Sequence, residues 1–171
     1  MPLKTLLRTH EGRVALVTGA GQGIGQAIAL ALAERGAQVI ATDLTPPDET
    51  ARKIGSSAYA IQLDVTQEEQ WRSAAAKTQD VGEVEIVVNN AGYFPNRSID
   101  ELDLATWRKT FATNLDSHFL SVKYFPANDA KEEVGPVCRH FVKHGWLGNT
   151  GDEPLHRHKD GHHRVHERIG Q

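Results

Sequence analysis

The chain has 171 residues, enough for about one domain of roughly 100–200 residues. Its 19 Lys plus Arg stand against 22 Asp plus Glu, giving a formal charge of −3 without a basic stripe, so nucleic acid is not an expected partner. A lone cysteine, Cys138, and a first segment, 1–10, without the apolar stretch of a signal peptide or membrane span predict a reduced, cytoplasmic protein that does not contact a membrane.

Short apolar runs alternate with helical stretches over residues 1–125, which predicts an α/β fold of parallel strands joined by crossover helices. The first strand is expected at 13–18, where apolar residues follow one another as in a strand covered on both faces. Apolar residues then repeat at helical spacing from Ile24 to Leu32, and Arg35-Gly36 ends this first helix.

Three more strands are expected at 38–42, 58–63 and 84–89, and the first two are followed directly by Asp43 and Asp64. Acids at the carboxyl ends of parallel strands lie where ligands bind in open α/β sheets. Thr66 followed by Glu69 has the form of a capping box, which predicts a helix over 67–78 with Thr66 as its N-cap.

A long helix is predicted from Leu104 to about Lys123, because apolar side chains recur every three or four positions and define a face that we expect to be buried. These are Trp107, Phe111, Leu115, Phe119 and Val122. After Phe125 the sequence shows neither the pattern of a strand nor that of a helix, so residues 126–171 are expected to form a poorly structured tail. The sheet of the 1–125 domain would then be incomplete, and the edge of its fourth strand would lack a partner.

Residues 18–25, Thr-Gly-Ala-Gly-Gln-Gly-Ile-Gly, join the first strand to the first helix. Glycines there permit a tight turn and let backbone amides approach a pyrophosphate, which the helix amino terminus also favours. A merely flexible connection is the alternative, but the flanking strand and helix favour a dinucleotide site. Its expected residues are Gly19, Gln22, Gly23, Ile24 and Gly25.

Asp43 ends the second strand, where an acid can hydrogen-bond the adenosine ribose and repel the additional phosphate of NADP. Neither Gln22 nor Leu44, the neighbours best placed to meet that phosphate, is basic. NAD is therefore the expected cofactor in preference to NADP. The alternative is that Asp43 is a solvated acid that begins the turn at Pro46-Pro47.

Three motifs occur in order: the glycine turn at 18–25, Asp-Val at 64–65 and Asn-Asn-Ala-Gly at 89–92. In this order they resemble the short-chain dehydrogenase/reductase family over about residues 10–125. The resemblance implies a Rossmann-like, doubly wound parallel sheet. It also implies that Asp64 and Val65 contact the adenine, that Asn90, Ala91 and Gly92 line the cofactor cleft, and that Asn114 is the helix asparagine of the catalytic tetrad. The alternatives are that Asn89 and Asn90 cap a turn and that Asn114 is a polar interruption in a helix.

The same resemblance implies an oxidoreductase that moves hydride between nicotinamide and a small secondary alcohol or ketone, and that assembles as a homo-oligomer. Such enzymes use a tyrosine as general acid/base, with a lysine four residues later and a serine before it. None of Tyr59, Tyr93 and Tyr124 has a lysine four positions on. The chain is therefore either this oxidoreductase or a catalytically inactive NAD-binding remnant.

A frameshift near residues 127–128 is our hypothesis for the missing pair. Displacing the reading frame by one base from Asn128 permits, without requiring, a strand ending in two serines followed by a tyrosine and a lysine in the family's spacing. The tyrosine codon would straddle Leu155 and His156, and the lysine codon Lys159 and Asp160.

The competing interpretation of the tail is a metal-binding module, since His156, His158, His162, His163 and His166 offer imidazoles at close spacing. Zinc sites usually need four ordered ligands, and the single Cys138 lies far from these histidines. We therefore expect no metal site.

Overall fold

The computed structural model describes residues 8–126 and 140–142, and its centre is a parallel sheet with strand order β3-β2-β1-β4-β5. The strands are β1 (Val14–Thr18), β2 (Gln38–Asp43), β3 (Ala58–Gln62), β4 (Val84–Asn89) and β5 (His140–Val142). All four strand pairs are parallel. The predicted Rossmann-like α/β architecture is thereby confirmed.

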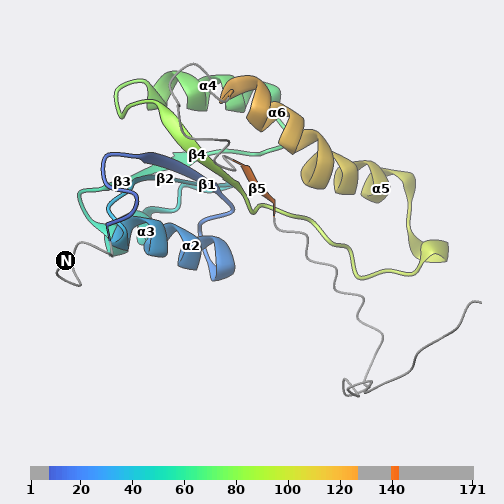
Figure 1. Cartoon of the computed structure of the whole chain (residues 1–171). Helices are drawn as coiled ribbons and strands as arrows, with labels where there is room; N and C mark the ends of the chain where they lie inside the picture. The colour runs from blue at the N-terminus through green and yellow to red at the C-terminus, as the bar shows by residue number, and fades with distance from the viewer. Residues whose placement is uncertain (1–7, 127–139, 143–171) are drawn as a thin grey trace, which may run out of the picture.

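Helices cover both faces of the sheet, as Figure 1 shows, with α2 (Gly23–Glu34) and α3 (Asp48–Ile54) on one face. On the other face lie α4 (Glu68–Thr78) and α6 (Ser117–Tyr124). Each face has its own apolar core because the strand residues alternate between them. Ala15 and Val17 of β1 pack towards Ala29 of α2, whereas Leu16 packs in the cluster that contains Trp71.

Strand β5 was not expected, and the prediction that the edge of β4 lacks a partner is wrong. Val87 of β4 pairs in parallel with His140, and the pairing continues to Asn89 and Val142. A strand of three residues is too short to show a period in the sequence. Apart from Pro126, the rest of the predicted tail lies outside the described residues.

The start of α4 corrects the predicted capping box. The helix begins at Glu68 after Gln67, and no side chain caps it. The Thr66 hydroxyl instead donates to Asp64 Oδ1 at 2.7 Å, so this threonine orders the loop after β3. A capping box does occur at Ser98 and Glu101, on the short 3₁₀ helix η1 (Ile99–Glu101).

The predicted long helix comprises α5 (Leu104–Phe111), a π-helical turn, η2 (Ala112–Asp116), and α6. Its apolar stripe faces outward, which contradicts the expected buried face: Leu115 is 59% and Phe119 66% exposed. The side of η2 and α6 that packs inward instead carries Thr113, Ser117, Leu120 and Ser121. Small polar side chains bring this helix close to the sheet, and Ser121 Oγ accepts a hydrogen bond from Asn89 Nδ2.

Candidate functional site

A cleft of about 620 Å³ opens at the carboxyl ends of the strands, where the glycine turn, the end of β2 and the loops after β3 and β4 meet. Most of the predicted site residues line it, which places them together as the sequence suggested. They are Gly19, Gln22, Ile24, Gly25, Asp43, Asp64, Val65, Asn90, Ala91 and Gly92. Gly23 and Asn114 lie beside the cleft and are not part of its lining.

The glycine turn needs its glycines for two different reasons. Gly19 and Gly23 have φ of 65° and 57°, a left-handed conformation that side chains disfavour. A Cβ at Gly25 would collide with the carbonyl oxygen of Gly19. Helix α2 then begins at Gly23 with no side-chain cap and no acid in its first turn. The amides at this end are thus available to an anion, which the helix dipole also favours.

The carboxylate of Asp43 is held in place at the cleft by two backbone amides. Its Oδ2 accepts a hydrogen bond from Gly21 N at 2.8 Å, and its Oδ1 accepts one from Leu44 N at 2.8 Å. Each carboxylate oxygen has further lone pairs for a ligand hydroxyl. This geometry differs from a freely solvated acid, the alternative considered for this position.

Asn90 both lines the cleft and ties the glycine turn to β4. Its Nδ2 donates to the carbonyl oxygens of Thr18 and Gly19 at 2.9 and 3.1 Å. The hydroxyl of Thr18 accepts from the amides of Asn90 and Ala91, both at 3.0 Å. The turn-capping alternative for Asn90 therefore describes part of its contacts. The connecting role of Thr18 was not anticipated.

The loop after β3 brings Asp64 and Val65 to the same cleft. Asp64 Oδ1 accepts hydrogen bonds from the amide and hydroxyl of Thr66. The carbonyl oxygen of Val65 accepts one from Trp71 Nε1 at 2.9 Å, which anchors the loop in the core. Val65 is largely buried, and the part of its side chain that lines the cleft gives an apolar edge that suits the face of a flat ring.

Asn114 lies in η2, directly behind the loop after β4. Its Oδ1 accepts from Tyr93 N at 2.9 Å and its Nδ2 donates to Tyr93 O at 2.8 Å. The polar-interruption alternative therefore fails to account for its contacts. Tyr93, Lys109 and Thr113 also line the cleft.

Of these three residues, Lys109 and Thr113 were not predicted from the sequence. Lys109 Nζ lies 4.4 Å from the centroid of the Tyr93 ring, a cation–π contact. The i, i+4 spacing of Lys109 and Thr113, next to Asn114, is the signal that could have placed them on one side of the helix.

The tail features considered above, the histidine cluster and the codons at 155–160, lie outside the described residues. Within 8–126 and 140–142, no group of three or more His, Cys, Asp or Glu could hold a metal ion. Over that same part of the chain, no helix is long and apolar enough to cross a membrane.

Residues 13–137 match the model of the short chain dehydrogenase family. The chain belongs to this family. The match extends past the boundary at residue 125 that the sequence analysis proposed. Members of the family are oxidoreductases that bind NAD or NADP and act on small molecules.

Curated relatives match over most of the length of this chain. A 3-oxoacyl-acyl-carrier-protein reductase of Vibrio cholerae is 37% identical over 144 residues, which cover 82% of this chain and 59% of the relative. Galactitol 2-dehydrogenase (L-tagatose-forming) of Cereibacter sphaeroides is 39% identical over 128 residues, or 73% of this chain and 50% of the relative.

Among solved structures, a short-chain type dehydrogenase/reductase from Mycobacterium marinum superposes with a TM-score of 0.66 at 32% identity. The superposition covers 70% of this chain and 51% of that one. The chain thus spans about half to three fifths of the length of these proteins.

Proposed function

We propose that the cleft binds NAD, and that the protein's reaction is hydride transfer between the nicotinamide and a small secondary alcohol or ketone. The bound cofactor supplies the hydride acceptor or donor. In this assignment the glycine turn and the amino end of α2 hold the pyrophosphate, Asp43 binds the adenosine ribose, and Val65 packs on the adenine. Asn114 holds the loop on the nicotinamide side.

The observation that carries the choice of NAD is the fixed carboxylate of Asp43. Two amides hold it at the end of β2, where the ribose of a dinucleotide lies in this fold. An additional phosphate on that ribose would meet a negative charge at short range. Gln22 and Leu44, which line the cleft beside it, bring no compensating cation.

The test is titration of the Asp43→Asn variant with NADH and NADPH, with Asp80→Asn as the matched control. Asp80 is exposed and lies outside the cleft lining. We expect Asp43→Asn to lower the affinity for NADH at least about tenfold, because charge-assisted hydrogen bonds to the ribose are lost. The ratio of the affinities for NADH and NADPH should also become smaller. Unchanged affinities in Asp43→Asn would refute this cofactor assignment.

A second candidate function is favoured by one sequence observation, the absence of a Tyr-x-x-x-Lys pair anywhere in the 171 residues. In that case the chain binds NAD and performs no turnover, since Asn114 alone cannot exchange a proton with an alcohol. An assay with NAD and assorted secondary alcohols separates the two candidates. Hydride transfer by this chain would exclude the inactive form.

The frameshift hypothesis relates the two candidates, because the gene would encode the oxidoreductase and this reading frame the inactive form. The nucleotide sequence across residues 125–130 tests it. We expect a displaced frame that encodes the tyrosine and the lysine. A displaced frame without them would end the hypothesis.

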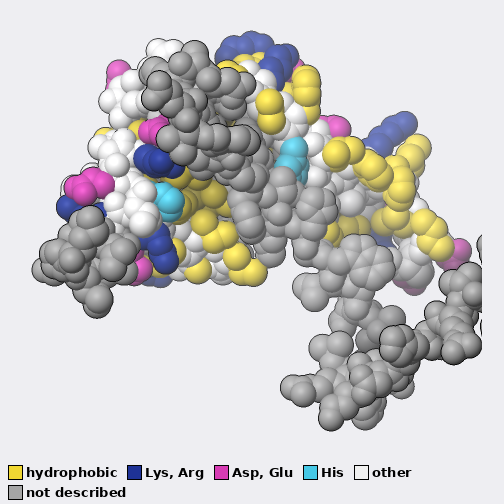
Figure 2. All heavy atoms as spheres, in the orientation of Figure 1, with side chains coloured by type: hydrophobic (Ala, Val, Ile, Leu, Met, Phe, Trp, Pro, Cys, Tyr) yellow, Lys and Arg dark blue, Asp and Glu magenta, His cyan; other side chains and the backbone are white. Residues whose placement is uncertain are grey.

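We also propose that a second copy of this chain covers the outward apolar face of α5 and α6. Hydrophobic side chains gather over these helices in Figure 2. The exposed residues of this face, called the apolar stripe below, are Leu104, Trp107, Phe111, Leu115, Phe119 and Val122. A contiguous apolar face of this kind is typical of a protein interface.

A further inference from the structure

Gly21 lies directly against the side chain of Asp43, a contact that the glycine pattern in the sequence does not predict. The Gly21 amide donates to Asp43 Oδ2 at 2.8 Å, and a Cβ at Gly21 would lie 2.7 Å from that same oxygen. Gly21 is not among the glycines with positive φ, so its backbone conformation is open to alanine. The residue is therefore constrained by the carboxylate beside it.

Hydrogen bonds to the backbone of Ala20 and Gly21 hold the turn in place, so it cannot easily move away from Asp43 to relieve such a contact. Ala20 N donates to Thr42 O at 2.9 Å, and Ala20 O accepts from the hydroxyl of Thr50 at 2.8 Å. Gly21 O accepts from Gln26 Nε2 at 3.2 Å. Thr50 is completely buried and also accepts a hydrogen bond from Gln26. A side chain at position 21 would therefore displace the carboxylate and leave the turn in place.

We propose that Gly21 is a positioning residue that determines nucleotide specificity through Asp43. Its amide directs the carboxylate, and its missing side chain leaves the space that the carboxylate occupies. This inference rests on the NAD binding proposed above. An alanine at position 21 turns the carboxylate away from the ribose, so ribose hydrogen bonds are lost and repulsion of a 2′-phosphate is reduced.

The experiment compares Gly21→Ala, Asp43→Ala and the double variant in the full chain, by calorimetric titration with ADP-ribose and with 2′-phospho-ADP-ribose. Gly21→Ala is expected to lower the affinity for ADP-ribose about tenfold and to change the affinity for the phosphorylated probe far less. In the Asp43→Ala background, Gly21→Ala is expected to leave the ratio of the two affinities unaltered, because the carboxylate that it would displace is absent.

Gly55→Ala is the matched control, since Gly55 ends α3 with φ of 88° and lies outside the cleft lining. It should lower the unfolding temperature and leave the ratio of affinities unchanged. Equal weakening of both probes by Gly21→Ala, or a ratio that still shifts in the Asp43→Ala background, overturns the inference alone. Failure of the parent chain to bind either probe overturns the proposed function and the inference with it.

Discussion

Asn114 and Tyr93 are joined by two reciprocal hydrogen bonds, in which the side-chain amide of Asn114 pairs with both backbone groups of Tyr93. The side chain of Asn114 thereby satisfies the backbone N–H and C=O of Tyr93, as the backbone of a neighbouring strand would. It lies in the π-helical turn η2, a helix irregularity that occurs frequently at functional sites. The loop that begins at Asn90 is thus held from the glycine turn on one side and from η2 on the other.

Replacing Asn114 by alanine removes both bonds and leaves the Tyr93 backbone groups without this partner. We expect the free energy of unfolding to fall by about 1–2 kcal/mol, because two partly buried hydrogen bonds are lost. Urea titration of the full chain measures it. Asn96→Ala, at an exposed position of the following loop, is the control and should change stability little. Equal stabilities of the two variants would argue against the structural role of Asn114.

Gly25→Ala should impair nucleotide binding most severely among substitutions in the turn. The added Cβ collides with the backbone carbonyl of Gly19, which cannot rotate away as a side chain could. We expect an unfolding penalty of about 1–3 kcal/mol and loss of measurable NADH binding. Gly12→Ala, where φ is 79° but the space is open, separates backbone strain from collision. NADH binding retained by Gly25→Ala would show that the turn is not the pyrophosphate site.

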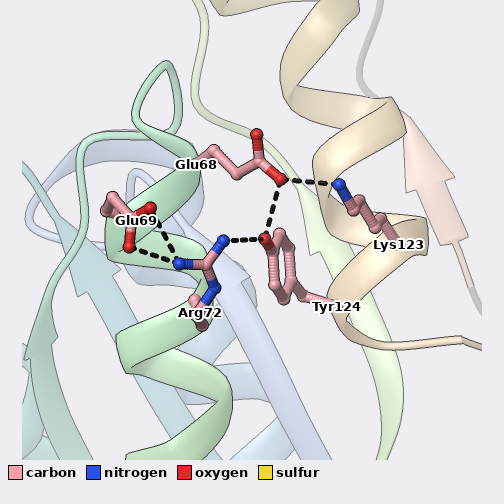
Figure 3. A network of polar contacts seen from close by, with 5 residues as sticks. All are labelled: Glu68, Glu69, Arg72, Lys123 and Tyr124. Atoms are coloured by element: carbon pink, nitrogen blue, oxygen red, sulfur yellow. Dashed lines mark hydrogen bonds and ion pairs between the residues drawn. The ribbon is translucent and has the colours of Figure 1, made fainter.

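Glu68 is the centre of an exposed polar network that joins α4 to α6, drawn in Figure 3. Its Oε1 accepts from Lys123 Nζ at 2.6 Å and from the Tyr124 hydroxyl at 2.8 Å. These hydrogen bonds, with the charge of Lys123, lower the pKa of Glu68 below its ordinary value of 4.5.

A pKa that is lower in the folded state makes a stabilising contribution above the unfolded pKa, and this contribution is lost as the pH falls through the folded pKa. Glu68→Gln should therefore destabilise the chain at pH 7, and the difference in stability from the parent should be smaller at an acidic pH below 4.5, the ordinary pKa of a glutamate. High salt should shrink the difference at neutral pH, because the network is exposed. Urea titrations at the two pH values, with the exposed Glu34→Gln as control, measure this; a pH-independent difference would contradict it.

The apolar stripe should control self-association. Phe119→Asp introduces a charge at a residue that is 66% exposed, so the isolated fold tolerates it while an interface does not. We expect the variant to sediment as a monomer at concentrations where the parent forms a dimer or larger assembly. Ser73→Asp, on the exposed side of α4, should sediment as the parent does. A monomeric parent would refute the proposed interface.

Sequence periodicity predicted β1, β2 and β4 closely because buried parallel strands are continuous apolar runs. It failed for α3, which has seven residues after Pro46-Pro47 and is too short to display a helical period. For α5 and α6 it identified the apolar stripe correctly but predicted that the stripe is buried, since a pattern shows which side is apolar and not what covers it.

Some features of the candidate site could likewise be predicted from the sequence, and others could not. The glycine turn and the acids that follow strands could be predicted because each residue type has a local conformational or positional reason. The contact of Gln26 with Thr50 joins residues 24 positions apart, and only the packing of α3 against α2 creates it. Contacts of this kind have no sequence signature.

Titration of the full chain with NADH and with NADPH, followed by nicotinamide fluorescence, tests the central claim most directly. The arrangement of the glycine turn and Asp43 predicts stoichiometric NADH binding, with NADPH at least about tenfold weaker. Equal or tighter binding of NADPH, or no binding of either nucleotide, would contradict it.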